Sequence, residues 1–217
     1  MSTALMTEPV QLGTLALPGD LVIPAQSLGL VMFAHGSGSG RLSPRNQWVA
    51  RALQRVNMAT LLFDLLTEEE ACDRRLVFDI DLLAGRVVEA IHWAEHHPDL
   101  SHLRLGLFGA STGAAAALAA AATRPDRVAA VVSRGGRPDL ALSSLPRVQA
   151  PTLLIVGGLD TEVLELNRLA LRQLRAPKRL EVVPGAGHLF QEPGALGSVA
   201  AFACSWFQHH LGNERRG

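Results

Sequence analysis

The sequence predicts an α/β fold in which helices cover both faces of a mostly parallel sheet. Short apolar segments of strand length recur along the chain, and most are followed by apolar residues at helical spacing. Strands that alternate with helices in this way favour a parallel sheet buried on both sides. No linker interrupts the 217 residues, and this length fits one domain. We therefore expect residues 1–217 to form a single domain.

The expected elements follow one another in regular order. Residues 8–23 are typical of a β-hairpin with its turn at Pro18-Gly19-Asp20, which gives the sheet an antiparallel first edge. Further strands are expected at 28–34, 60–64, 103–108, 128–132, 152–156 and 180–183. Helices are expected at 46–56, 77–96, 114–122, 163–174 and 197–211. The glutamates at 68–70 are interpreted as an acidic loop.

The composition excludes several classes of function. Acidic and basic residues number 20 each, so the net charge predicts no nucleic-acid partner and no binding to an anionic membrane. Lys178 is the only lysine, whereas a Walker-type phosphate loop needs a lysine beside its glycines. The N-terminus has no signal-peptide pattern, and no apolar stretch is long enough to span a membrane. We therefore expect a cytoplasmic protein.

Neither the cysteines nor the histidines are spaced as metal ligands. Cys72, in a predicted loop, and Cys204, on the last predicted helix, lie far apart and form no CxxC. We expect both to be reduced thiols. Most of the histidines fall within or near helices, and neighbours such as His96 and His97 point about 100° apart on a helix. The sequence therefore predicts neither a metal site nor a cofactor.

The chemistry is predicted to begin at Ser111, the central residue of Gly109-Ala110-Ser111-Thr112-Gly113. This pattern lies between a buried strand and a helix, the context that a nucleophile elbow requires. The serine of such an elbow occupies a sharp, strained turn, and glycines two residues before and after it remove side chains that would clash. The alternative is a glycine-rich turn with an incidental serine.

A serine hydroxyl becomes a useful nucleophile when a base takes its proton. His188 is the candidate, because it follows the last predicted strand in a glycine-containing loop. Asp160 follows the preceding strand and would orient the imidazole. Ser111, Asp160 and His188 thus occur in this order, each after a strand, at the edge where α/β sheets place ligands. Glu162 and Asp64 are the rival acids.

Backbone amides are expected to stabilise the oxyanion of acyl transfer. One is the N–H of Thr112, directly after the nucleophile. The other is assigned to the N–H of Ser37, in the loop after the strand at 28–34, with Gly36 as the alternative. We interpret His35 as a support for this loop. A dinucleotide-binding interpretation is disfavoured, because the glycines are spaced GxGxG rather than GxGxxG.

These motifs together resemble the α/β-hydrolase superfamily, and within it the small branch similar to dienelactone hydrolases. The resemblance extends from His35 to His188 in motifs and to the final helix in architecture. It implies an eight-stranded sheet and a Ser111–His188–Asp160 triad. Dienelactone hydrolases carry cysteine in the elbow, so Ser111 favours simple ester hydrolysis. Only residues 133–150 separate the sixth and seventh strands, which leaves no room for a helical lid domain.

The predicted function is therefore that of a serine hydrolase that cleaves small carboxylic esters through an acyl-enzyme. The expected partner is a small-molecule ester, and the sequence does not determine the oligomeric state. A thioesterase, lactonase, dienelactone-type or peroxyacid-forming enzyme on the same triad is one alternative. A catalytically inactive binding module is another. Arg134, which follows the strand at 128–132 on the side of the site, has two interpretations. It binds a substrate carboxylate, or it is held by backbone carbonyls or by the glutamates at 68–70.

Overall fold

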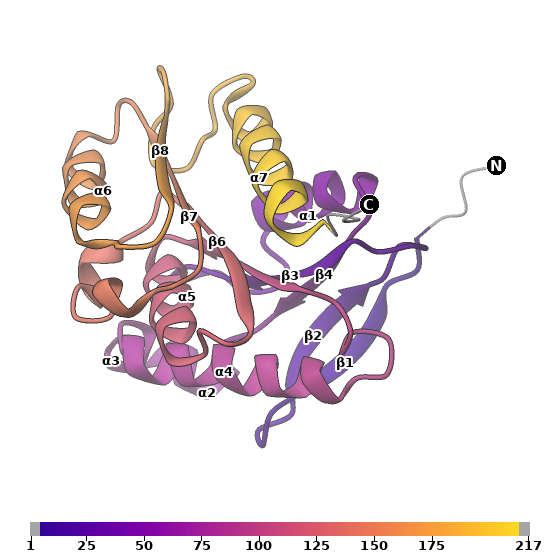
Figure 1. Cartoon of the computed structure of the whole chain (residues 1–217). Helices are drawn as coiled ribbons and strands as arrows, with labels where there is room; N and C mark the ends of the chain where they lie inside the picture. Colours follow the sequence, from indigo (N-terminus) through magenta and orange to yellow (C-terminus); the bar gives the residue numbers. More distant parts are fainter. Residues whose placement is uncertain (1–4, 213–217) are drawn as a thin grey trace.

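Eight strands form one sheet in the order β1-β2-β4-β3-β5-β6-β7-β8 (Figure 1). The computed structural model describes residues 5–212. Both ends of the predicted domain, at residues 1 and 217, lie outside the described residues. The strands are β1 (Glu8–Leu12), β2 (Leu17–Val22), β3 (Gly29–Ala34), β4 (Met58–Phe63), β5 (Leu105–Ala110), β6 (Val128–Arg134), β7 (Thr152–Gly157) and β8 (Lys178–Val183).

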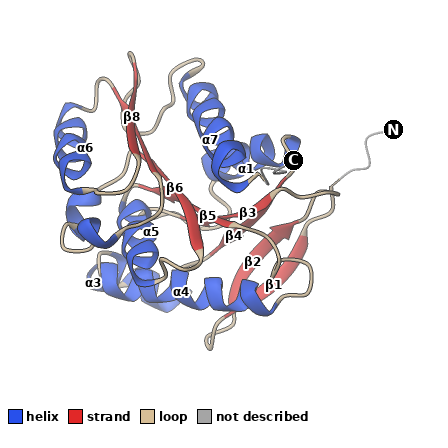
Figure 2. Cartoon of the chain, viewed as in Figure 1, coloured by secondary structure: helices blue, strands red, loops and turns tan. Residues whose placement is uncertain are grey.

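Seven α-helices connect or follow the strands in the described residues. They are α1 (Pro44–Arg55), α2 (Glu68–Cys72), α3 (Arg74–Val77), α4 (Ile80–His96), α5 (Thr112–Thr123), α6 (Thr161–Gln173) and α7 (Ala195–Leu211). The predicted strands and the long predicted helices are all present, with ends shifted by a few residues. The prediction of a mostly parallel sheet with helices on both faces is confirmed (Figure 2).

The first edge of the sheet is antiparallel, as expected, but the predicted turn is wrong. β1 pairs with β2, and β2 pairs antiparallel with β4. Pro18-Gly19-Asp20 lies inside β2 rather than between the strands. The chain reverses at residues 13–16, where the Ala16 N–H donates to the Gly13 carbonyl and both residues have positive φ. Gly19 fits the strand because a Cβ there would lie 3.0 Å from Val10.

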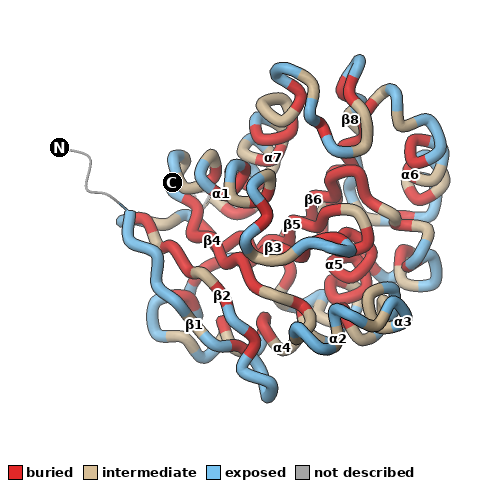
Figure 3. Tube along the Cα trace, turned by 180° about the vertical axis from the view of Figure 1, so that it is seen from behind, coloured by how far each residue is buried: buried red, intermediate tan, exposed pale blue. Residues whose placement is uncertain are grey.

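The two largest hydrophobic cores lie between the sheet and the helices that cover its two faces. One core joins the sheet to α4, α5 and α6, and the other joins it to α1 and α7 (Figure 1). Residues of β3 alternate between them, since Met32 belongs to the first core and Phe33 to the second. Every residue of β3, β4, β5 and β7 is buried (Figure 3). This burial explains why those strands are apolar throughout.

The parallel strands β3, β4, β5, β6, β7 and β8 end at the same edge of the sheet. The six loops that leave these ends begin at His35, Asp64, Ser111, Gly135, Gly158 and Pro184. Open α/β sheets bind ligands at this edge. The topology therefore brings the predicted nucleophile, acid, base and oxyanion loop into one region.

The predicted acidic loop is a short helix. Thr67 caps α2 through a reciprocal capping box with Glu70, in which each side chain accepts the other's backbone N–H. Glu68, Glu69 and Glu70 occupy the first turn, where negative charge complements the helix dipole. Cys72 ends this helix and is exposed, so its prediction as a loop residue is also wrong.

The connection from β6 to β7 is compact, as predicted, and holds two short 3₁₀ turns, Pro138–Ala141 and Leu145–Arg147. No lid domain is inserted there.

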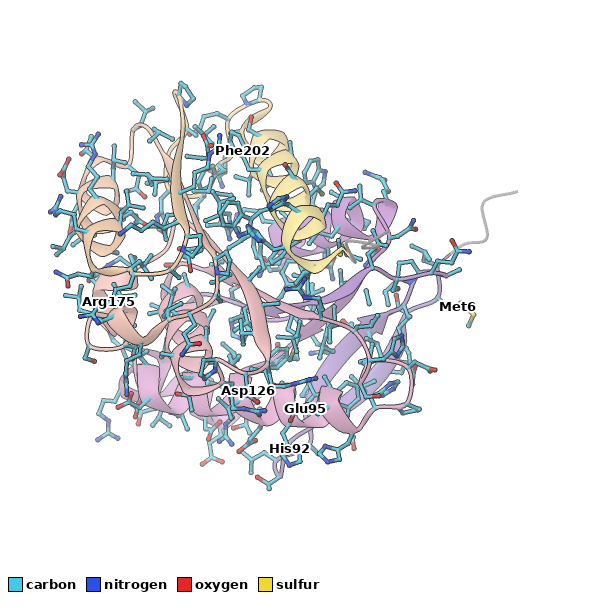
Figure 4. All side chains as sticks on the ribbon, in the orientation of Figure 1. Met6, His92, Glu95, Asp126, Arg175 and Phe202 are labelled. Carbon is cyan, nitrogen blue, oxygen red and sulfur yellow. The ribbon has the colours of Figure 1, made fainter. Side chains whose placement is uncertain are left out.

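At the opposite edge of the sheet, Arg124 donates to both Glu95 and Asp126, which links the end of α4 to the start of β6 (Figure 4). Within residues 5–212, no helix combines the length and apolarity needed to cross a membrane.

Candidate active site

Ser111 occupies a strained turn between β5 and α5. Its backbone has φ 51° and ψ −122°, although it is not a glycine. Such conformations cost about 1–3 kcal/mol and persist where the surroundings enforce them. Here the Ser111 N–H donates to the Arg134 carbonyl, and the Ser111 carbonyl accepts from the Arg137 N–H, at 3.2 and 3.1 Å. The turn that the sequence predicts is therefore held by the end of β6 and by the loop that follows it.

The two glycines of the elbow are required by close backbone contacts. A Cβ on Gly109 would lie 2.4 Å from the Cα of Ala114, in the first turn of α5. A Cβ on Gly113 would lie 2.2 Å from the carbonyl oxygen of Ala34, at the end of β3. Both distances are far below van der Waals contact. The glycines thus allow α5 to begin directly against the sheet.

His188 and Asp160 form a hydrogen-bonded pair, with 2.7 Å between Nδ1 and Oδ2. Asp160 precedes α6, but its side chain makes no capping bond to the helix and contacts His188 instead. The two loops are joined through their backbones, since the Leu159 N–H donates to the Ala186 carbonyl. Gly157 permits this approach, because a Cβ there would lie 2.3 Å from that same carbonyl oxygen.

The rival acids make other contacts. Asp64 accepts from the backbone N–H and the guanidinium of Arg41, at 2.7 and 2.6 Å, and so anchors the loop after β3. Glu162 lies in the first turn of α6. Among residues 5–212, Asp160 is the carboxylate that contacts His188, and no hydrogen bond joins His188 to the Ser111 hydroxyl.

The two predicted oxyanion donors lie beside each other. The Ser37 N–H donates to the Thr112 hydroxyl at 2.9 Å, so this side chain holds the loop after β3 against the elbow. A bound oxyanion would compete with that hydroxyl for the Ser37 amide. Gly36, the alternative donor, is also close, because a Cβ there would lie 3.0 Å from Cβ of Ser111.

His35 is a buried neutral side chain that shapes the same loop. Its Nε2 accepts from the Leu65 N–H at 3.0 Å, while Nδ1 lies 3.0 Å from the Gly36 carbonyl. Nδ1 therefore carries the proton in this arrangement. Burial lowers the pKa of His35 below its ordinary value of 6.5, against smaller raising effects of the Gly36 carbonyl and Asp64. Protonation would break the bond from Leu65.

The free energy of unfolding is expected to decrease as the pH falls below about 6.5. The unfolded chain takes up a proton on His35 near that pH, whereas the folded chain does so only at lower pH, so acid favours unfolding. The measurement is Tm between pH 5 and 7.5. Burial also lowers the pKa of His210. The pH dependence of Tm is therefore compared between the single variant His210→Gln and the double variant that carries His35→Gln and His210→Gln. An unchanged pH dependence in the double variant would contradict this role.

Two polar residues near the site, one buried and one half-buried, were not identified from the sequence. Asn167 on α6 donates to the Gly136 carbonyl at 2.9 Å and so fixes the loop after β6. Glu192 accepts from the Gly187 N–H at 3.0 Å, directly before His188. The only signal for Asn167 was a polar residue between Val163 and Ala170 on the apolar face of a helix. Glu192 gave no recognisable pattern.

A cavity of about 350 Å³ adjoins the oxyanion loop and Thr112. Its other walls come from the loop after β4 and from α2, α3 and α4. They include Leu65, Leu66, Ala71, Val77 and Leu83. The cavity thus combines an apolar wall with the backbone of the oxyanion loop. Its volume lies within the range of about 300–1,000 Å³ that is usual for ligand pockets.

Comparisons with known proteins show the family and the fold. The model of the dienelactone hydrolase family matches residues 54–211. The crystal structure of a dienelactone hydrolase from Anabaena variabilis is 57% identical, with a TM-score of 0.92 over 95% of this chain and 98% of that chain. The structure of Est1E from Butyrivibrio proteoclasticus has a TM-score of 0.80 at 14% identity, covering 94% of this chain and 98% of that chain, and shows the fold alone.

A curated relative from Mycobacterium tuberculosis is 55% identical over 209 residues. It carries the provisional name phosphoribosyl transferase. The match covers 95% of this chain and 47% of the relative. The chain therefore spans about half the length of this relative, and the relative's name describes a protein with a further portion that this chain does not match.

Proposed function

Because the chain belongs to the dienelactone hydrolase family, we propose that it is a serine hydrolase that cleaves small carboxylic esters through an acyl-enzyme. The observation that carries the proposal is the 2.7 Å bond between His188 and Asp160, at the sheet edge where the strained elbow presents Ser111. Serine replaces the cysteine that is typical of the dienelactone branch.

In the proposed mechanism, Asp160 accepts a hydrogen bond from the Nδ1–H of His188, which leaves Nε2 unprotonated and free to act as a base. The Ser111 hydroxyl oxygen attacks the ester carbonyl, and its proton passes to Nε2. That proton then goes to the departing alcohol as the C–O bond breaks. A water molecule, deprotonated by the same nitrogen, hydrolyses the acyl-serine. The amides of Thr112 and Ser37 stabilise the negative oxygen of both tetrahedral intermediates.

Short acyl chains are expected to be preferred. The cavity of about 350 Å³ lies near the lower end of the range of about 300–1,000 Å³ for ligand pockets, and no lid domain extends it. The test is kcat/KM for p-nitrophenyl acetate and butyrate against the laurate and palmitate esters. Leu83→Ala removes part of the apolar wall and so enlarges the cavity, which should move the preference toward longer acyl chains. A clear preference of the unaltered protein for long chains would contradict the proposal.

Lactone hydrolysis is the second candidate, supported by the 57% identity to a dienelactone hydrolase. Both reactions use the same acyl-serine, so the ratio of kcat/KM for a five-membered lactone and for a linear ester separates them. The provisional name of the M. tuberculosis relative is not extended to this chain, because the match covers only 47% of that relative.

A further inference from the structure

The side chain of Thr112 is a buried hydroxyl whose proton has no acceptor among the described residues. Thr112 is the first residue of α5 and is 3% exposed. Its Oγ1 accepts from the Ser37 N–H at 2.9 Å. A hydroxyl that accepts one hydrogen bond still has its own proton to donate, and no carbonyl or carboxylate within residues 5–212 accepts that proton. Because a buried donor without an acceptor is costly, a tether to Ser37 explains only half of this side chain.

The other threonine of α5 shows how a threonine in a helix ordinarily satisfies its hydroxyl. The Thr123 hydroxyl donates to the carbonyl of Ala119, four residues earlier, at 3.0 Å. Thr112 has no such neighbour, because β5 and the elbow precede it and α5 begins at Thr112 itself. Its hydroxyl therefore has no acceptor in a preceding helical turn.

The hydroxyl lies where the two proposed oxyanion amides meet. Its oxygen is 2.9 Å from the Ser37 nitrogen and belongs to the same residue as the other amide. Ser37 and Thr112 both line the cavity of about 350 Å³, so a group that enters the cavity reaches the hydroxyl. The N-terminus of α5 also carries partial positive charge, which favours a negative oxygen at this place.

We propose that the Thr112 hydroxyl is a third donor to the oxyanion and therefore a catalytic residue. The inference rests on the proposed ester hydrolysis and adds a residue to its site. As the Ser111 oxygen bonds to the carbonyl carbon, the Ser111 proton passes to Nε2 of His188 and the carbonyl oxygen becomes negative. That oxygen accepts from the hydroxyl as well as from the two amides. The Ser37 N–H, shared between Oγ1 and the oxyanion, makes the hydroxyl a stronger donor, because linked hydrogen bonds polarise one another.

Thr112→Val tests the donor, because it removes the hydroxyl and keeps a side chain of similar shape. The kcat for p-nitrophenyl acetate should fall about 10²-fold, the usual effect of losing one oxyanion donor. KM should change little, since the neutral carbonyl of the bound ester is a weaker acceptor than the oxyanion. Thr112→Ser keeps the hydroxyl and should retain most of the activity. Thr123→Val is the matched control on the same helix and should leave kcat unchanged.

A second comparison separates loss of the donor from loosening of the loop that carries Ser37. Arg41→Met loosens the same loop from its other end, because the Arg41 guanidinium donates to Asp64 at 2.6 Å. Hydrogen exchange of the peptide 36–43 measures the loosening in each variant. A trifluoromethyl ketone reports on the oxyanion without turnover, since its carbonyl carbon bonds to the nucleophile and its oxygen becomes negative. Thr112→Val should raise its inhibition constant about 10²-fold, far more than Arg41→Met does at a similar rate of exchange.

Several outcomes would overturn the inference and leave the proposed reaction standing. One is a Thr112→Val variant that keeps the kcat and the inhibition constant of the unaltered protein. Another is a more active variant, which would mean that the hydroxyl only competes for the Ser37 amide. A third is an equal loss in Thr112→Val and Arg41→Met at equal exchange. If Tm shows that Thr112→Val does not fold, Thr112→Ala decides by the same comparison. An unaltered protein that neither hydrolyses the ester nor binds the ketone would overturn the proposed function and the inference with it.

Discussion

Ser111→Ala is expected to lower kcat/KM for short esters by about 10⁴-fold or more, with little change in Tm. The hydroxyl is the proposed nucleophile, and removing a triad serine eliminates the acyl-enzyme route, leaving only the effect of binding and of the oxyanion amides. Alanine tolerates the surroundings because Ser111 makes its described contacts through the backbone, to Arg134 and Arg137. The measurement is hydrolysis of p-nitrophenyl acetate at saturating and limiting concentrations.

Ser205→Ala is the matched control, since Ser205 is an exposed serine on α7. It should retain full activity. If Ser111→Ala keeps more than about a tenth of the activity of the unaltered protein, where a triad serine contributes orders of magnitude, the nucleophile has been wrongly assigned.

Gly113→Ala is expected to destabilise the protein by about 3 kcal/mol or more, or to prevent folding, as forced overpacking does. The added Cβ would lie 2.2 Å from the Ala34 carbonyl oxygen and 2.3 Å from that of His35. Both are backbone atoms, so no side chain can move aside. Relief requires that α5 shift away from β3, which would also displace the elbow.

The control is Gly85→Ala in the middle of α4, where a Cβ would meet nothing within 4 Å. Alanine there should stabilise the protein by about 0.5–1 kcal/mol, because glycine is a poor helix former. Urea unfolding of the two variants gives both changes. Similar stabilities for Gly113→Ala and Gly85→Ala would mean that α5 does not pack as closely against β3 as the structure shows.

The order of strands and helices could be predicted from the sequence because burial on both faces makes the central strands β3, β4, β5 and β7 short apolar runs. Local turns were harder. Pro18-Gly19-Asp20 has the composition of a turn, but Gly19 is needed where β2 packs closely against Val10. The actual reversal at residues 13–16 uses positive φ at Gly13 and Ala16, and alanine gives no sequence signal for that conformation.

The start of α2 was predictable in principle, because Thr67 and Glu70 have the spacing of a capping box. The run of glutamates suggested a solvated loop instead. The contacts of Arg134 could not be predicted. Its place just after a predicted strand was clear, but the absence of a neutralising carboxylate among the described residues depends on how α1 and the loop with Phe190 meet above β6. Such long-range packing has no local pattern.

The central claim is that Ser111 is an activated nucleophile, and a fluorophosphonate probe tests it most directly. The folded protein is incubated with the probe, digested and analysed by mass spectrometry. The account predicts one added phosphonyl group on the peptide containing Ser111, with labelling strongly reduced in His188→Gln, which lacks the base. No mass gain on Ser111 in the folded protein, or equal labelling after loss of His188, would contradict it.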